Sequence, residues 1–334
     1  MPEMNTQGFV MTMIQINSDK LNFKQCKELA LLSISTRKGT PMESEKGVDE
    51  IAQSIENLSK NDAFQILTAS DQNGKLCGWI YYYVAFPLMT FISGFYPVVA
   101  KTPYSEEIAL ELIEASKRNI LKYGRSRLEI ELVFPTEDHR AHSSQLVEWY
   151  RKCGFQFAAE EIHMKSDLSQ IELPQLNVPK GYVLKKFSEV SYERLEDSGF
   201  RTLKNSMEGL FLSMSHSEQK VTLEYFFSKS KPHIEDSSLI LEKDDEIIGF
   251  AITRVGDDGN PDIGPVGLVP EARGKGLGSY LIARVLQSLK DSGSTCAFLD
   301  TTITNQPAQK LYRKYGFEDE YFKQFYYWSP KEVI

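Results

Sequence analysis

Cysteine is scarce in this sequence of 334 residues. Its four copies are dispersed, at Cys26, Cys77, Cys153 and Cys296. No CxxC pair occurs, so the pattern fits neither a disulfide framework nor a zinc site, and we expect reduced thiols. His139 and His142 stand close together beside Asp138. Because no further ligand cluster accompanies them, we interpret this stretch as a solvated loop or helix start and predict no metal.

Long apolar runs and an excess of positive charge are also missing. No run approaches the ~20 residues that span a bilayer, and the N-terminal segment has no basic region before its apolar residues. The chain carries 38 Lys and Arg against 46 Asp and Glu, a net charge of −8. A protein that binds nucleic acid usually presents a basic footprint. We therefore predict a cytoplasmic protein that binds neither nucleic acid nor membrane.

An internal repeat is the main feature that the sequence does have. The segments WYRKCGF (149–155) and LYRKYGF (311–317) are near copies, and a turn followed by an apolar strand precedes each, ending at Val84 and Val255. Between the copies, the stretch from Ile171 to Gly181 holds two prolines and a glycine and has no helical period. We place a linker at 171–180, between a first domain at 1–170 and a second at 181–334.

The second copy shows strands mixed with helices. Its order is strand 182–187, two helical or irregular stretches within 189–231, strands 238–244, 247–255 and 262–269, helix 275–290, strand 295–302, helix 306–315 and strand 322–328. This order predicts an α/β or α+β fold with a mixed, mostly antiparallel sheet flanked by helices.

The segment ARGKGLGSYL (272–281) places three glycines and two cations at the start of an amphipathic helix. The first amides of a helix have no intrahelical partner and the helix dipole favours negative charge, so this is a site for a phosphate or pyrophosphate. A GxGxxG motif would need glycine at Ser279, and a P-loop would need Lys followed by Ser or Thr after the last glycine. Both alternatives are excluded by spacing.

Two segments resemble motifs of the GNAT-type N-acetyltransferase superfamily. LVPEARGKGLGSYLIARVL (268–286) is similar to the acetyl-CoA motif Arg/Gln-x-x-Gly-x-Gly/Ala, which Arg273, Gly276 and Gly278 fill. NQPAQKLYRKYGF (305–317) is similar to the later motif with its Asn, Leu-Tyr and Gly-Phe. The tandem layout is like that of mycothiol synthase, so we expect two GNAT-like domains of which the second is catalytic.

The resemblance implies acetyl-CoA as co-substrate, with its pantetheine arm between two splayed strands and its pyrophosphate on the glycine loop. The residues that it assigns to acetyl-CoA are Leu268, Val269, Arg273, Gly274, Lys275, Gly276, Leu277, Gly278, Ser279 and Asn305. A primary amine would attack the thioester directly, and Tyr312 matches the tyrosine that protonates the departing thiolate. Tyr312 also fits a buried helical stripe, and Asn305 also fits a helix N-cap, so structural roles stay open for both.

Asp262 is the candidate general base. It begins the strand that runs into the glycine loop, and mycothiol-synthase-like members carry a carboxylate at the corresponding place. The alternative is that Asp262 belongs to the acidic surface turn DDGNPD (257–262).

The first copy departs from the motif. Aligned on Pro103 and Pro270, its counterpart of the glycine loop reads YSEEIALELI, with Glu106 and Glu107 where an anion would bind. Ser143 replaces Asn305, and the retained Tyr150 is most simply a core residue. We expect this domain to have lost acetyl-CoA.

The sequence thus predicts an acetyl-CoA-dependent N-acetyltransferase that acts on a small-molecule amine as a monomer or homodimer. Two alternatives remain, a protein that binds acyl-CoA without turnover as a sensor or scaffold, and transfer of a longer acyl or aminoacyl group. The acceptor pocket should lie within 189–231. Its large apolar side chains are Met207, Phe211, Met214, Phe226 and Phe227, which we expect to be core.

Overall fold

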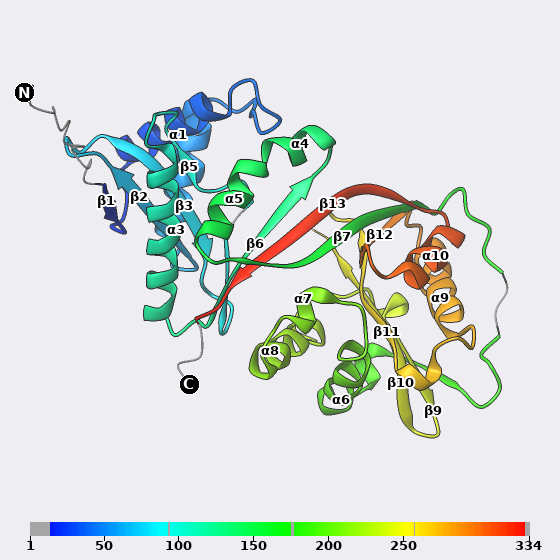
Figure 1. Ribbon diagram of the computed structural model, residues 1–334. Coiled ribbons are helices and arrows are strands. Elements are labelled where there is room, and N and C mark those ends of the chain that lie inside the picture. The colour runs from blue at the N-terminus through cyan, green and yellow to red at the C-terminus, as the bar shows by residue number, and fades with distance from the viewer. Residues whose placement is uncertain (1–13, 93, 175–176, 257, 331–334) are drawn as a thin grey trace, which may run out of the picture. The chain divides into compact units, whose positions relative to one another are not determined.

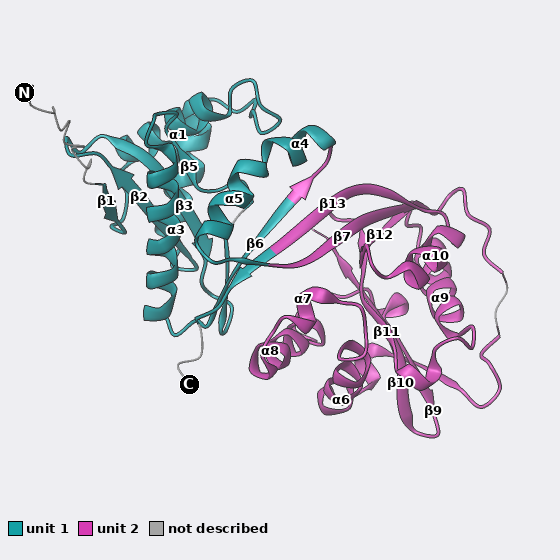
Figure 2. Ribbon diagram, viewed as in Figure 1, with its two compact units in different colours: residues 1–132, 137–156, 326–334 teal, residues 133–136, 157–325 magenta. Residues whose placement is uncertain are grey.

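In the computed structural model the chain divides into two compact units (Figures 1 and 2). The structure describes residues 14–92, 94–174, 177–256 and 258–330. Unit 1 comprises residues 1–132, 137–156 and 326–334, and unit 2 comprises residues 133–136 and 157–325. Each unit has its own strands and its own helices.

Unit 1 holds the sheet order β1-β2-β3-β4-β6, with β5 paired to β3. Its strands are β1 (Gln15–Asn17), β2 (Phe64–Ser70), β3 (Leu76–Tyr83), β4 (Met89–Ile92), β5 (Val98–Val99) and most of β6 (Arg127–Phe134). Its helices are α1 (Phe23–Arg37), α2 (Val48–Lys60), α3 (Ser105–Lys122), α4 (Glu137–His142) and α5 (Ser144–Lys152). The neighbours β2–β3 and β3–β4 run antiparallel, and β4–β6 runs parallel.

Unit 2 holds the order β13-β7-β12-β11-β10-β9-β8. Its strands are β7 (Gln156–Asp167), β8 (Val183–Lys186), β9 (Leu239–Lys243), β10 (Glu246–Val255), β11 (Pro261–Leu268), β12 (Cys296–Thr302) and most of β13 (Phe317–Trp328). Its α-helices are α6 (Tyr192–Leu203), α7 (Gly209–Leu212), α8 (His216–Phe226), α9 (Leu277–Asp291) and α10 (Gln306–Lys314). Short 3₁₀ turns occupy Phe187–Glu189, Glu235–Ser237 and Pro270–Ala272. The predicted mixed, mostly antiparallel sheet flanked by helices is confirmed.

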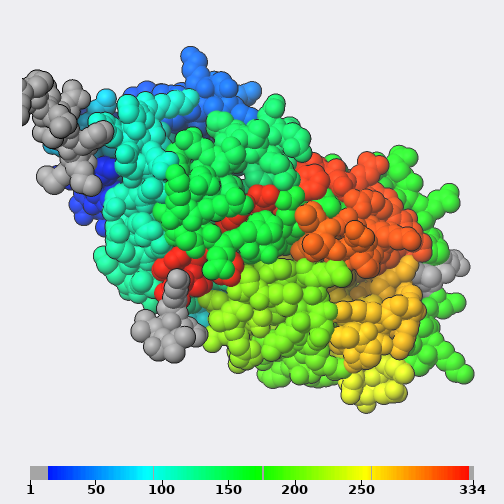
Figure 3. Space-filling view, in the orientation of Figure 1, coloured from blue at the N-terminus to red at the C-terminus, as the bar shows by residue number. Residues whose placement is uncertain are grey.

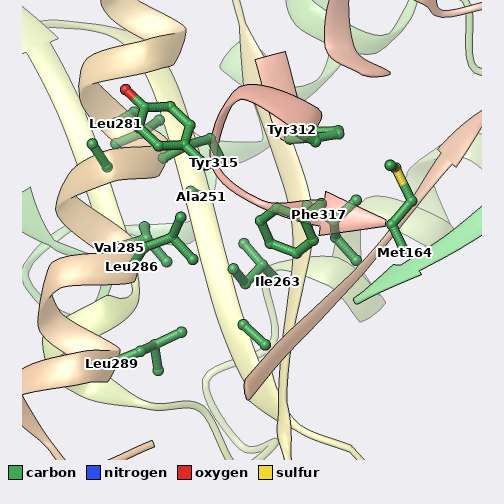
Figure 4. Packing of buried hydrophobic residues seen from close by; sticks show 14 of the residues in the cluster. Met164, Ala251, Ile263, Leu281, Val285, Leu286, Leu289, Tyr312, Tyr315 and Phe317 are labelled. Atoms are coloured by element: carbon green, nitrogen blue, oxygen red, sulfur yellow. The ribbon is translucent and has the colours of Figure 1, made fainter. Parts of the chain in front are cut away.

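Helices cover both faces of the unit 2 sheet, because alternate strand residues point to opposite sides. On one face, Ala251, Ile263 and Leu299 pack with the apolar stripe of α9 and with α10 (Figure 4). On the other face, Phe250 and Ile252 pack with residues of α6 and α8. The α9 stripe consists of Leu281, Ile282, Val285, Leu286 and Leu289, all fully buried.

Strand β7 belongs to unit 2 although it lies in the first sequence copy. It pairs antiparallel with β12 over seven residues from Glu161 to Asp167, and its Ile162 and Met164 are buried in the core that α9 covers. The boundaries of the units therefore differ from those of the two sequence copies, which the linker at 171–180 divides. The division into domains 1–170 and 181–334 stays a prediction. The consequence is that strand β7 of the first copy sits inside the sheet of the second.

Strands β11 and β12 diverge. They are parallel neighbours whose register is defined at a single pair, Asp262 with Phe298. On its other edge β11 stays paired with β10 from Pro261 to Leu268, with a bulge between Ala251 and Thr253. Beyond Asp262, the edge of β11 that faces β12 is thus open to a ligand. The resemblance implied such a pair of splayed strands.

Candidate acyl-transfer site

The glycine loop between β11 and α9 forms an anion cradle. Gly274 and Gly276 have φ of +71° and +79°, which only glycine adopts without strain, and a Cβ at either would meet nothing within 4 Å. Tyr280 makes the first helical bond of α9, to the Gly276 carbonyl at 3.0 Å. The amides of Leu277, Gly278 and Ser279 therefore have no partner within the helix. Open space above free amides suits a phosphate group.

Arg273 shapes the loop instead of offering its charge to a ligand. Its Nε donates to the Leu268 carbonyl at 3.0 Å, and its two terminal nitrogens donate to the carbonyls of Asn205 (2.6 Å) and Thr202 (3.0 Å). These bonds fix the start of the loop to the end of α6. In the space-filling view the surface of the α6–α8 segment meets that of the segment with α9 (Figure 3). Lys275 is exposed beside the cradle.

A second lysine near the cradle was not predicted. Lys314, at the end of α10, donates to the Ser279 hydroxyl at 3.2 Å. The Tyr315 hydroxyl lies 2.6 Å from the same Ser279 oxygen, which fixes the first turn of α9 against α10. The repeated segment 311–317 contains Lys314, but only the packing of the two helices brings it to the loop.

The two strand residues predicted to pair with pantetheine have different surroundings. The Val269 amide donates to the Ile248 carbonyl at 3.0 Å, so it is already used within the sheet. Because successive residues of a strand direct their amides to opposite edges, the Leu268 amide faces the open edge of β11. Leu268 is therefore the better placed of the two to pair with a ligand.

Helix α10 places Asn305 and Tyr312. The Asn305 side chain accepts from the Ala308 amide at 3.3 Å, so its predicted N-cap role is confirmed. Tyr312 is 6% exposed and packs edge-on against Phe317, with ring centroids 5.9 Å apart. Figure 4 shows both residues within the core cluster. Burial raises the pKa of Tyr312 above its ordinary value, and the Glu208 carboxylate raises it further. The hydroxyl therefore keeps its proton at neutral pH.

Glu208, the N-cap residue of α7, was missed by sequence reasoning because no motif marks it. Burial raises the pKa of its carboxyl, against a hydrogen bond from Asn305, and the charge of Asp300 raises it further. Its neighbour Met207 is 50% exposed, which corrects the expectation that it belongs to the core. Of the other apolar residues in this stretch, Phe211 and Phe227 are core as predicted, and Met214 and Phe226 pack against them.

Asp262 lies at the point where β11 and β12 diverge. Burial raises the pKa of its carboxyl, and the nearby Asp300 raises it further, against the charges of Lys323 and His163. Asp262 is half-buried, so it is not a simple surface-turn residue. Asp300 and His163 are further groups that the sequence did not reveal, because β12 and β7 are far apart in the chain.

The first copy has a different structure at the counterpart of the glycine loop. Glu106, in the first turn of α3, pairs with Lys152 at 2.6 Å. The Tyr150 hydroxyl donates to the Tyr96 carbonyl at 2.7 Å within the core, so its predicted core role is confirmed. A cavity of about 760 Å³ adjoins this region, lined by residues that include Glu106, Ser143 and Trp149.

His139 and His142 lie on helix α4, and across the described residues His, Cys, Asp and Glu do not gather in groups of three or more that could hold a metal ion. None of the described helices combines the length and the apolar character of a bilayer span.

Comparisons with known proteins agree with this site. The acetyltransferase (GNAT) family matches residues 205–317, from Asn205 through the glycine loop to Phe317. The mycothiol acetyltransferase of Thermomonospora curvata is 30% identical over 176 residues, which are 51% of this chain and 54% of that protein. The chain thus spans about half the length of the curated relatives it matches.

Two solved structures share the fold across nearly the whole chain. One is a GCN5-related N-acetyltransferase from Sphaerobacter thermophilus, with a TM-score of 0.56 and 14% identity over 94% of this chain and 95% of that one. The other is a tandem GNAT protein from the clavulanic acid biosynthesis pathway, with a TM-score of 0.51 and 13% identity over 96% of this chain and 100% of that one. Residues 205–317 therefore match the acetyltransferase (GNAT) family, and the chain shares its fold with a tandem GNAT protein.

Proposed function

We propose that unit 2 transfers an acetyl group from acetyl-CoA to a primary amine of a small molecule, with Asp262 as general base and Tyr312 as general acid. The observation that carries the proposal is the combination of a glycine cradle with free amides and a strand edge that opens from Asp262 toward that cradle. The activity, the substrate class and the residue roles all belong to this proposal.

The residues present fit acetyl-CoA, which would supply the acetyl thioester. The amides of Leu277, Gly278 and Ser279 are free within α9 to hold a pyrophosphate, with Lys275 and Lys314 as nearby cations. A side chain at Gly276 would enter the open space above these amides. The Leu268 amide at the open edge of β11 can pair with an amide of the pantetheine arm.

Asp262 suits the role of a base. An amine is protonated at neutral pH, with a reference pKa near ~10, and must lose a proton before it can attack. A carboxylate with a raised pKa accepts that proton more readily than an ordinary one. Asp300 interacts electrostatically with both Asp262 and Glu208 in unit 2, and these carboxyl groups favour a cationic acceptor there.

Tyr312 holds its proton for the departing sulfur. Burial and the nearby Glu208 carboxylate disfavour the tyrosinate, so Tyr312 carries its proton until the thiolate departs. Glu208 thus belongs to the proposed site together with Tyr312 and Asn305.

The first test is a calorimetric titration of the full chain with acetyl-CoA, followed by a panel of amines with acetyl-CoA consumption measured by chromatography. We expect one site per chain and consumption that depends on an amine. Failure of the folded protein to bind acetyl-CoA would refute the enzyme proposal. Binding without consumption across cationic amines would favour the sensor or scaffold alternative instead. The expectation of a monomer or homodimer stays a prediction, checked by sedimentation.

A further inference from the structure

A row of ionisable side chains crosses four strands of unit 2 beside Asp262. Asp262 on β11 is in register with Phe298 on β12, and Asp300 stands two residues further along β12, on the same face. Asp300 is in register with His163 on β7. Lys323 on β13 donates to Asp300 Oδ2 at 2.9 Å. The row therefore reads Asp262, Asp300, His163 and Lys323.

His163 is held rigidly in this row. Its ring stacks on Phe298 at 5.3 Å with an interplanar angle of 15°, and on Tyr321 at 4.4 Å with an angle of 19°. Its Nδ1 lies 2.8 Å from Asp300 Oδ1, and its Nε2 lies 3.7 Å from Glu320 Oε2. An imidazole held between two rings has a fixed orientation, so Nδ1 is directed at Asp300.

Asp300 is consequently held by one partner at each oxygen. Burial alone would raise the pKa of Asp300, but the hydrogen bond of His163 and the charge of Lys323 outweigh it, and the pKa lies below its ordinary value. Asp300 therefore remains a fixed negative charge beside Asp262. A fixed negative charge increases the affinity of a neighbouring carboxylate for a proton.

We propose that Asp300 is a positioning residue for the base Asp262, and that strand β7 of the first sequence copy supplies His163 to hold it. Asp300 acts through its charge and does not itself touch the acceptor amine. The inference rests on the proposed function, since it assigns the tuning of that same base. It also gives a role to a first copy that lacks the glycine loop.

Other charged groups face this row and must be counted with it. Glu320 lies on the exposed side of His163, and Lys165 of β7 stands over the Phe298 ring at 5.4 Å. His163 also lowers the pKa of Asp258, after larger contributions from hydrogen bonds with Asn260. Glu208 interacts with Asp300 from the α7 side. None of these groups bonds to either Asp300 oxygen, so the two groups that hold Asp300 remain His163 and Lys323.

The test measures the acidic limb of kcat against pH in the full chain. Asp300→Asn removes the negative charge, so Asp262 gives up its proton more easily and the limb should move to lower pH by about one and a half units, the size expected for a unit charge ~8 Å away at an effective dielectric of ~20. His163→Leu removes the charge of His163 that lowers the pKa of Asp262, so Asp262 holds its proton more tightly. The limb should then move to higher pH, by a smaller amount.

Three further variants separate this effect from a general loss of structure. His163→Asn keeps a donor toward Asp300 but carries no charge, so it should keep Asp300 in place and shift the limb in the same direction as His163→Leu. His233→Leu is the matched control, because His233 also pairs with a carboxylate at 2.8 Å, that of Glu235, but lies outside the row. It should leave the limb unmoved. Lys323→Gln, which weakens the other bond that holds Asp300, should shift the limb to higher pH and replaces Asp300→Asn if that variant does not fold.

A second readout needs no turnover. Carboxyl NMR titration of Asp262 in the wild type and in Asp300→Asn gives the same shift directly, so the inference can be judged even if no amine is acetylated. Absence of amine acetylation would refute the proposed function alone. An Asp262 titration that is identical in the wild type and in Asp300→Asn would refute the positioning role, whatever the activity.

Discussion

Substituting Gly276 with glutamate tests the cradle most directly, because it introduces into the open space above the α9 amides the charge that the first copy carries. At φ of +79° a residue with a Cβ costs about 1–2 kcal/mol of folding free energy relative to glycine. No atom lies within 4 Å of the added Cβ, so no clash adds to this cost. The variant should fold with a modestly lower melting temperature.

The effect on binding should be larger than the effect on stability. A carboxylate a few ångströms from a bound pyrophosphate reduces the binding free energy by ~2 kcal/mol or more per close like-charge pair at an effective dielectric of ~20. That corresponds to a Kd for acetyl-CoA at least ~30-fold weaker than in the wild type. Calorimetry at constant ionic strength measures this directly, and added salt should narrow the difference because it screens the repulsion.

Gly293→Glu is the matched control. Gly293 follows the opposite end of α9, has φ of +87°, and also has no atom within 4 Å of an added Cβ. Gly293→Glu therefore has the same backbone strain and adds the same charge. In addition, a glutamate at this end of α9 opposes the helix dipole, whereas a glutamate at Gly276 suits it. The acetyl-CoA affinity of Gly293→Glu should match that of the wild type. Equal weakening in both variants, or wild-type affinity in Gly276→Glu, would show that the loop is not the cradle.

Three further predictions concern single groups of the site. Tyr312→Phe should slow turnover by ~10²-fold or more with little change in acetyl-CoA affinity or melting temperature, since it keeps the ring that packs against Phe317; an unchanged rate would assign Tyr312 to the core alone. Asp262→Asn should abolish most turnover yet raise stability at neutral pH, because a carboxyl with a raised folded pKa opposes folding once the pH exceeds that pKa; the gain should vanish below the unfolded pKa of ~3.9. Arg273→Ala should lower the unfolding free energy by about 2 kcal/mol through loss of its carbonyl bonds and weaken acetyl-CoA binding, whereas a variant with normal affinity would show that the loop keeps its shape unaided.

Much of unit 2 could be predicted because its signals are local. The strand and helix order of the second copy, the glycine turn at Gly274 and Gly276, and the Asn305 cap each follow from a short stretch of sequence and elementary backbone preferences. The free amides at the start of helix α9 follow from the helix itself, whereas the anchoring of the loop needs Arg273 and the end of α6. The element order, the turn and the cap are confirmed because no distant partner decides them.

The remaining features depend on pairing between distant segments. His163 meets Asp300 only because β7 inserts beside β12, and a repeat analysis assigns β7 to the other copy. Glu208 comes close to Tyr312 through the packing of α7. Arg273 donates hydrogen bonds to carbonyls at the end of α6. A sequence read as two consecutive copies contains no signal that β7 joins unit 2, because β7 has the pattern of an ordinary amphipathic strand in either unit.

The placement of β7 in unit 2 leads to a prediction about truncation. Residues 181–334, the second domain as the sequence divides it, lack β7, so β12 would lose a partner over seven residue pairs and the core would lose Ile162 and Met164. Burial of two such side chains alone contributes ~3–6 kcal/mol, comparable with the whole stability of a typical domain. The chain 181–334 should therefore fail to unfold cooperatively in urea, while the chain 155–334, which restores β7, should recover a cooperative transition. Cooperative unfolding of 181–334 with wild-type acetyl-CoA affinity would show that β7 is dispensable, and would leave the first copy without the structural role that the position of β7 gives it.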